Sequence, residues 1–220
     1  MKSTQQGFTL VEIAIVLIII GVMLGGVLKG QELVGSAKAK SLANDFRQVP
    51  LFIYGYQDKY RRIPGDDVSA VANVSAPAAH TGNGDGVIGG NWDDKANGSE
   101  AVLFWEHVRL ANLASGSTDF TSATDNTPSL PTNTEGGRIG IQGRPPIAGM
   151  RGIHFVCSTG ITGKLARLLD LSLDDGNALR GSMMAVRATT STANSTAATP
   201  NPPPAEAYDD ALAYTVCMSA

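Results

Sequence analysis

The chain has 220 residues, of which 17% are charged, and its formal net charge is −3 at pH 7. This length suits one anchored domain, and the mild negative charge excludes a general electrostatic attraction for nucleic acid. Charged residues make up about 25% of a typical soluble domain, so their low share here, with 25 glycines, favours an exported, loop-rich β domain over a cytosolic enzyme.

The stretch of residues 7–28 is apolar for long enough to enter a membrane, and it carries one carboxylate, Glu12. An ionised carboxylate there costs on the order of 2.5–3.5 kcal/mol, so Glu12 is expected to have a partner. A secretory signal peptide is one alternative, but here the small-residue site Gln6-Gly7-Phe8 precedes the apolar run. Cleavage after Gly7 would leave the apolar helix in place and create an α-amine on Phe8, one helical turn from Glu12. That amine would be largely cationic at neutral pH and would neutralise Glu12 on the same or a neighbouring chain.

The residues Gly7-Phe8-Thr9-Leu10-Val11-Glu12-Ile13 resemble the cleavage and methylation motif of class III signal sequences, which type IV pilins and type II secretion pseudopilins carry. The resemblance implies that a prepilin peptidase cuts between Gly7 and Phe8 and methylates the Phe8 amine. It also implies that Glu12 recruits the next subunit by pairing with an incoming amine. Lys29 departs from the pattern, because many major pilins have a helix-breaking proline there. An uncleaved membrane anchor with a chance glutamate is the alternative interpretation.

Apolar residues then recur at spacings of three and four, which predicts one helix from near Phe8 to near Tyr60 whose second half packs under a globular head. The stripe consists of Leu42, Phe46, Val49, Ile53, Tyr56, Tyr60 and Ile63. Pro50 lacks a backbone donor and is predicted to kink the helix. The sequence Ile63-Pro64-Gly65-Asp66-Asp67 is expected to end it, and with Tyr60 it is similar to a Tyr…Leu-Pro-Gly-Asp stretch of pilin-like proteins.

The rest of the chain predicts an antiparallel sheet with two short helices. Four strand candidates, separated by turn signals, are residues 138–142, 152–157, 181–188 and 211–218. One helix is expected to open at Ser99, as its N-cap, with Glu100 near its positive end, and another to cover residues 165–171. Residues 189–206, rich in Thr, Ser, Ala and Pro, are expected to form a flexible excursion.

Cys157 and Cys217 are the two cysteines. In an exported chain an even pair predicts a disulfide, which would contribute roughly 4 kcal/mol by the chain-entropy model. Two unpaired buried thiols are the alternative.

The segment of residues 81–88 is similar to a calcium loop. Asn83 and Asp85 stand at positions where such a loop has oxygen ligands, and Gly86 stands at its sharp turn. Thr81 and Trp92 replace the usual first and last acidic ligands, so Asp66, Asp67, Asp93 or Asp94 would have to complete a site of another kind. The alternative is a glycine-rich turn with solubilising side chains.

No catalytic pattern is present in the sequence. The histidines at positions 80, 107 and 154 are scattered, and no GxSxG, HExxH or GxxxxGK motif occurs. We therefore expect no enzyme and no cofactor other than the candidate calcium ion. His107, in a heavily apolar helix, is expected to be a core or interface residue rather than a ligand.

The resemblance implies an α+β, type IV pilin-like fold in which a long N-terminal helix packs on an antiparallel sheet. The expected parts are a leader (1–7), a membrane or filament-core half of the helix (8–28), an amphipathic half (29–62) and an α+β head (63–220) whose C-terminal loop the disulfide bounds.

The implied function is a structural subunit of a type IV pilus, whose assembly would serve adhesion, motility or DNA uptake. Its partners would be prepilin peptidase, an inner-membrane assembly platform and other pilins. Before assembly the chain would cross the bacterial inner membrane once, with its head in the periplasm, and afterwards it would lie in an extracellular pilus or a periplasmic pseudopilus. A type II secretion pseudopilin and a calcium-stabilised, membrane-anchored surface binding domain are the alternatives.

Overall fold

The computed structural model describes residues 10–188, 204–205 and 207–220. Gly7, Phe8 and most of the expected excursion at residues 189–206 lie outside this part of the chain. Contacts divide the chain into two units, Met1–Lys38 and Ala39–Ala220, and each is described by itself.

Helix α1 (Leu10–Tyr60) confirms the predicted long helix and continues through both Lys29 and Pro50. In the first unit its side chains are almost all apolar and exposed. An 18-residue window of α1 has a mean hydropathy of 2.8 and no buried residue, so this helix is long and apolar enough to cross a membrane. At position 29, Lys29 Nζ lies 2.6 Å from Glu32 Oε2, an exposed pair that helical spacing allows.

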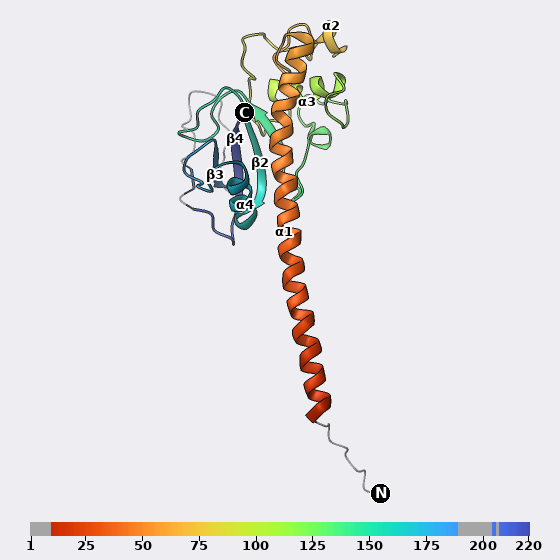
Figure 1. The fold of residues 1–220 in the computed structure, drawn as a ribbon. Coiled ribbons are helices and arrows are strands. Elements are labelled where there is room, and N and C mark those ends of the chain that lie inside the picture. Colours follow the sequence, from red (N-terminus) through yellow and green to blue (C-terminus); the bar gives the residue numbers. More distant parts are fainter. Residues whose placement is uncertain (1–9, 189–203, 206) are drawn as a thin grey trace. The chain divides into compact units, whose positions relative to one another are not determined.

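The second unit contains a four-stranded antiparallel sheet, so the predicted α+β, pilin-like class is confirmed (Figure 1). The strand order is β1-β2-β4-β3, with bounds β1 (Ile139–Gln142), β2 (Phe155–Thr162), β3 (Met183–Arg187) and β4 (Ala213–Ser219). The predicted bounds of β2 were wrong: it starts three residues later than expected and runs on to Thr162. It continues because Gly160, at φ 74°, lies within a register shift between Ser158 and Ile161, so pairing with β4 resumes beyond the bulge.

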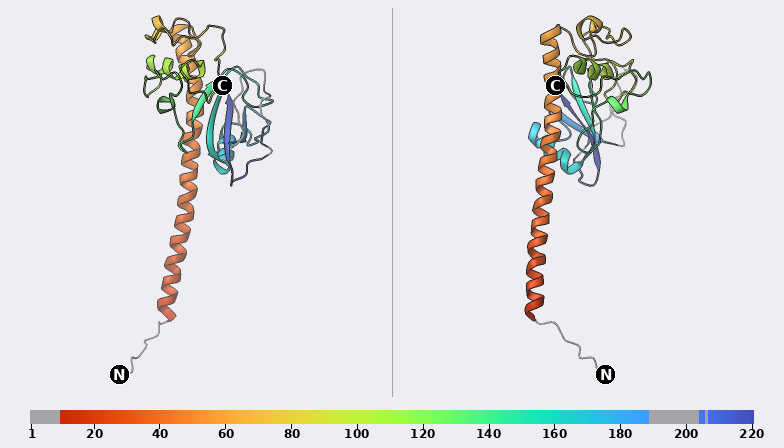
Figure 2. Two further views of the ribbon diagram at one scale, coloured as in Figure 1. Left: turned by 180° about the vertical axis from the view of Figure 1, so that it is seen from behind. Right: turned by 90° about the vertical axis from the view of Figure 1, so that its right-hand side faces the viewer.

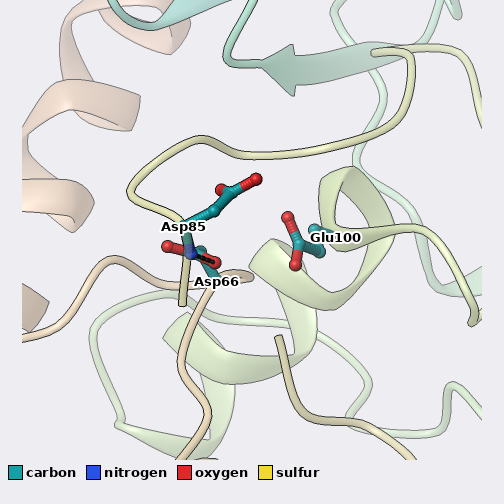
Figure 3. A group of neighbouring side chains, drawn as sticks. All are labelled: Asp66, Asp85 and Glu100. Carbon is teal, nitrogen blue, oxygen red and sulfur yellow. Dashed lines mark hydrogen bonds between the residues drawn. The ribbon is translucent and has the colours of Figure 1, made fainter. Parts of the chain in front are cut away.

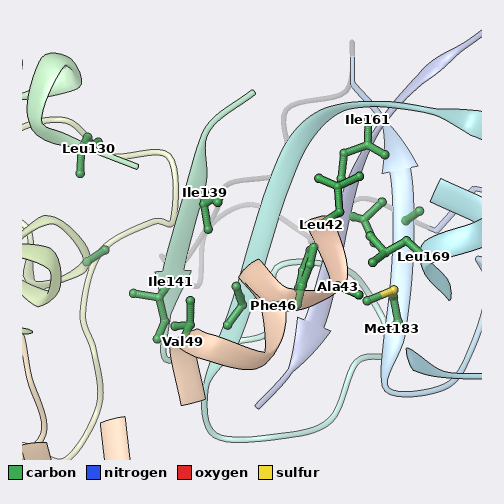
Figure 4. Close-up of a cluster of buried hydrophobic side chains, with 14 of the residues drawn as sticks. Leu42, Ala43, Phe46, Val49, Leu130, Ile139, Ile141, Ile161, Leu169 and Met183 are labelled. Carbon is green, nitrogen blue, oxygen red and sulfur yellow. The ribbon is translucent and has the colours of Figure 1, made fainter. Parts of the chain in front are cut away.

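The apolar stripe on the second half of α1 packs against the sheet (Figures 2 and 4). Leu42, Phe46, Val49, Ile53 and Tyr56 are each at most 2% exposed. Figure 4 shows the first three gathered with side chains of the sheet and of α4 (Gly163–Leu173), among them Ile139, Ile141, Ile161, Leu169 and Met183. The helical periodicity in the sequence therefore identified the face that builds the main core.

The remaining helices partly match the prediction. Helix α3 (Glu100–Leu110) follows Ser99 as expected, and α4 extends the predicted 165–171 helix by two residues at each end. The short α2 (Ala70–Val74) and the 3-10 helix η1 (Thr127–Ser129) were not predicted. Every residue of α3 from Glu100 to Arg109 is buried, and these include four polar or charged side chains, Glu100, Glu106, His107 and Arg109.

Cys157 and Cys217 form the predicted disulfide. They are register partners on β2 and β4, with Cα atoms 4.1 Å apart. Both are fully buried in a second apolar cluster, which also contains Trp92, Ile147, Met150, Phe155, Met184 and Val186.

Candidate functional site

Glu12, one of the two expected assembly residues, lies in the first turn of α1. A carboxylate is favoured there by the positive end of the helix dipole. Gly7 and Phe8, the expected cleavage and methylation residues, lie outside the described residues, so their placement relative to Glu12 stays a prediction.

The glycine-rich loop after Thr81 is organised around Asp66 rather than around its own side chains. The backbone N–H groups of Gly84, Asp85 and Gly86 donate to the Asp66 carboxylate at 2.6, 3.1 and 2.8 Å. Gly84 and Gly86 have φ values of 77° and 86°, and this backbone turns successive N–H groups toward one point. The loop therefore binds an anion of its own chain, and Asp66 is 4% exposed.

Glu100 ties the same loop to the start of α3. Its Oε1 accepts from Asn83 N at 2.8 Å and its Oε2 from Gly89 N at 2.7 Å. Asp66, Asp85 and Glu100 thereby come together, with one oxygen of each within 4.8 Å of the others (Figure 3).

Of the two predicted calcium ligands, Asp85 belongs to this group of three carboxylates. Asn83 lies in the same loop, and its Oδ1 accepts from the Asp85 backbone N at 2.8 Å. Calcium binding by either residue stays a prediction. Asp66 was among the suggested completing residues, whereas Glu100 was expected only to favour the helix terminus. No spacing in the sequence could have found Glu100, since α3 brings it to the loop from a separate element.

The other suggested acidic residues serve local structure. Asp67 accepts from Tyr56 Oη at 2.8 Å and from Asn73 Nδ2 at 2.7 Å, which holds the segment after α1 against that helix. Asp94 accepts from Ser99 Oγ at 2.7 Å. Ser99 is the N-cap residue of α3, as predicted, although its side chain makes no cap hydrogen bond.

Burial affects the charge of Glu100 more than its two acidic neighbours do. The pKa of Glu100 is raised by burial and further by Asp66 and Asp85, while the backbone N–H groups of Gly89 and Asn83 oppose that shift. Carboxylate oxygens are the ligands that Ca²⁺ prefers, so the donor chemistry fits that ion. These oxygens already accept five backbone hydrogen bonds from residues 83–86 and 89, so water or further backbone carbonyls would have to supply the rest of a coordination shell.

A second acidic group, Asp170, Asp174 and Asp175, lies at the end of α4. Asp170 accepts from Tyr208 Oη at 2.7 Å, Asp174 accepts from Met183 N at 2.9 Å, and Asp175 pairs with Arg180 at 3.4 Å. Each of these carboxylates therefore has a structural partner.

Two of the histidines join the segment before the glycine-rich loop to α3. His80 Nδ1 lies 2.7 Å from Glu106 Oε2, and Asn97 Nδ2 lies 3.1 Å from His80 Nε2. Gly65 N donates to His107 Nδ1 at 3.0 Å, so His107 Nε2 carries the proton and donates to His80 O at 2.9 Å. His107 is fully buried, as predicted for a core residue.

Comparison with known proteins gives one match. The family model described as the prokaryotic N-terminal methylation motif matches residues 2–28. No curated protein and no solved structure matches the chain.

Proposed function

We propose that this chain, which carries the signature of type IV pilins and pseudopilins at residues 2–28, is a structural subunit of a type IV pilus. The observation that carries the proposal is the methylation motif, which overlaps the start of a membrane-capable helix, together with an α+β unit that has its own core. The motif implies processing by prepilin peptidase and assembly with other pilins. The apolar helix supports anchoring in a membrane before assembly.

In the proposed assembly, cleavage between Gly7 and Phe8 gives a chain that begins with N-methylated Phe8. Glu12 of a subunit in the filament would pair with the Phe8 amine of an incoming subunit. In an apolar surrounding, an ion pair is stronger than in water and a lone carboxylate is costly, so the pairing would favour docking in one register. Gly21, Gly25 and Gly26, whose added Cβ atoms would meet nothing within 4 Å, leave room for close approach of neighbouring helices.

A type II secretion pseudopilin carries the same signature and is the second candidate. The pilus is favoured by the Thr-, Ser-, Ala- and Pro-rich sequence of residues 189–206, which lies within the loop closed by Cys157 and Cys217. Such sequences cannot build a packed core and suit a surface exposed to the exterior.

Intact-mass measurement with amino-terminal peptide mapping tests the proposal on protein from sheared surface fractions and from membranes. A chain starting at N-methyl-Phe8 and abundant in the sheared fraction is the expected result. The same processed chain found only in membranes would favour the pseudopilin. A chain that keeps residues 1–7 while the peptidase is active would overturn both.

We also propose calcium binding at Asp66, Asp85 and Glu100, as the stabilising ion of the head, because three carboxylates converge there. The test is the thermal midpoint of the full chain in detergent, with calcium and with chelator. We expect calcium to raise the midpoint of the native chain but not of Asp85→Asn, with exposed Asp125→Asn as the matched control. Equal midpoints of the native chain in both conditions would contradict the proposal.

A further inference from the structure

Two neighbouring stretches of the second unit carry charges of opposite sign. Residues 110–137 contain aspartate and glutamate but no lysine or arginine, whereas residues 138–169 contain lysine and arginine but no aspartate or glutamate. Charges that a chain does not pair internally are available to a partner of opposite charge. Four exposed residues of these stretches form no ion pair within the described part of the chain: Asp119, Asp125, Arg144 and Arg151.

Asp119 and Asp125 each begin a turn of the same construction, and we call these two turns the acidic turns. The Oδ1 atom of Asp119 accepts from Thr121 N at 3.2 Å and from Thr121 Oγ1 at 2.7 Å. The Oδ1 atom of Asp125 accepts from Thr127 N at 2.9 Å and also from Thr127 Oγ1. In both turns the threonine two residues further on therefore fixes the direction of the carboxylate.

Both carboxylates stay ionised and keep one oxygen for a partner. The hydrogen bonds from the two threonines hold the pKa of Asp119 and of Asp125 below its usual range. Lys95 and Arg138 lower the pKa of Asp125 further, by a smaller effect. These bonds use only the Oδ1 atoms, and neither Oδ2 atom accepts a hydrogen bond from the described residues. The acidic turns thus present two oriented negative charges to the solvent.

The loop between β1 and β2, residues 143–153, presents the opposite charge, and we call it the basic loop. Arg144 and Arg151 are exposed, and neither guanidinium makes a hydrogen bond or an ion pair with the described residues. Between them, Ile147 and Met150 are buried in the apolar cluster around the disulfide. This anchoring reduces the conformational freedom that the loop would lose on binding a partner.

We propose that the basic loop of one copy of this chain binds the acidic turns of a second copy in the filament. This inference rests on the proposed function, because a pilus subunit must bind further copies of a pilin. A guanidinium presents parallel donors that match a carboxylate, so Arg144 and Arg151 suit Asp119 and Asp125 as partners. Ile153, which is 73% exposed beside Arg151, would supply an apolar contact within this polar rim.

The arrangement of the two surfaces suits an open assembly. Each copy can bind one neighbour through its basic loop and another through its acidic turns. A heterologous contact of this kind extends into a helical filament when its rotation does not close a ring. Exposed ion pairs add little affinity, whereas like charges placed together are costly, so the contact is expected to select the register in which copies fit.

Charge reversal in the full chain tests the contact, with the amount of chain in sheared filaments as the readout. The variant Arg144→Glu/Arg151→Glu should lower that amount by roughly tenfold or more, because the attractions become repulsions. Adding Asp119→Lys/Asp125→Lys to it reverses both surfaces and restores the net charge. This fourfold variant should return to within about threefold of the native amount, since exposed ion pairs differ little in strength.

The matched control is Arg62→Glu/Lys164→Glu, which changes the net charge equally at two exposed residues without an ion pair in the described part of the chain. It should assemble like the native chain. Thermal midpoints of each full chain in detergent establish that the variants are folded. The proposal is overturned if the arginine variant assembles as well as this control, or if a folded fourfold variant assembles no better than the arginine variant.

A cross-link decides the question if a variant fails to fold. The variant Arg144→Lys/Arg151→Lys keeps the charge, and a carbodiimide then condenses each ammonium with a touching carboxylate to an amide. We expect cross-linked dimers whose peptides join position 144 or 151 to Asp119 or Asp125, and dimers without such peptides would overturn the proposal. Native chain found only in membranes would instead contradict the pilus, and the same cross-link applied to those membranes would still test the contact.

Discussion

Asp66 is the residue on which the glycine-rich loop depends. Its carboxylate accepts from three successive backbone N–H groups, those of Gly84, Asp85 and Gly86, of which Asp85 N also donates to Asn83 Oδ1. The same sequence features that resemble a calcium loop, alternating Asn, Asp and Gly, also make a backbone that binds an anion. Sequence alone does not separate these outcomes, because the glycines permit both and the partner comes from a distant segment.

Asp66→Asn is expected to lower the free energy of unfolding by about 2–3 kcal/mol, since hydrogen bonds to a charged acceptor contribute more than neutral ones and the amide cannot accept all three. The measurement is denaturant unfolding of the full chain in detergent, followed by tryptophan fluorescence. Asp58→Asn, on the exposed side of α1, is the matched control. Equal stability of the two variants would show that the loop does not rely on the Asp66 charge.

At the scale of elements, periodicity and turn signals predicted α1, α3, α4 and all four strands. They succeeded because each element has a continuous apolar pattern, such as the buried stripe from Leu42 to Tyr56. They failed where geometry is set by tertiary contacts. The bulge at Gly160 moved the bounds of β2, and the five-residue α2 depends on the bonds of Asp67 to Ser69 N and Asn73 Nδ2. The group of three carboxylates was incompletely predicted for the same reason.

His107 forms the contact between α3 and residues 63–80 through its bonds to Gly65 and His80. We predict that this contact makes the chain less stable in mild acid. Burial lowers the pKa of His107, with smaller opposing effects, so the folded state stays neutral while the unfolded state binds a proton below about pH 6.5. Stability contributed by His107 is therefore present above that pH and falls as pH decreases, by at most about 1.4 kcal/mol per pH unit for one proton.

Unfolding free energies measured from pH 7.5 to 5.5 check this prediction, and His107→Gln should reduce the slope. His154, whose pKa burial also lowers, would leave a residual slope of the same sign. Glu106, whose pKa is raised mainly by burial, acts in the opposite direction, because its folded form binds more protons. An unchanged slope in His107→Gln would contradict the assignment.

The disulfide joins two adjacent strands, β2 and β4, over a sequence separation of 60 residues. Replacing both cysteines by alanine should lower stability by roughly 4 kcal/mol, which is the chain-entropy estimate for a loop of that length. Denaturant unfolding of the double variant, compared with the oxidised native chain, measures this, and the reduced native chain is the control for the loss of the thiol groups. A double variant as stable as the oxidised chain would show that the disulfide adds nothing to the stability that β2–β4 pairing provides.

At the scale of the whole molecule, the two units differ in whether their apolar side chains are buried within the single chain. The second has its own core, whereas large apolar side chains of residues 10–28 are exposed in the single chain, among them Leu10, Ile18 and Val22. Apolar surface of that extent marks a membrane or a protein interface. The methylation motif predicts that this region lies in a membrane or in the core of a filament, and either would cover its apolar side chains.

Glu12→Ala should leave the second unit folded but abolish incorporation into filaments, because the proposed pairing with the Phe8 amine would be lost. Glu32→Ala is the matched control, since Glu32 is an exposed carboxylate further along the same helix and pairs with Lys29. Immunoblots of sheared and membrane fractions measure the distribution. Normal amounts of Glu12→Ala chain in sheared filaments would refute the pairing.

The position of β4 has a consequence for how the chain is made. Strand β4 follows the other three in sequence but lies between β2 and β3, and it pairs with both. During synthesis β2 and β3 therefore emerge without the strand that joins them, and the sheet stays incomplete until residues 213–219 have left the ribosome. A nascent chain stalled before that point would present one unpaired edge of β2 and both edges of β3, which makes it a natural substrate for chaperones and proteases.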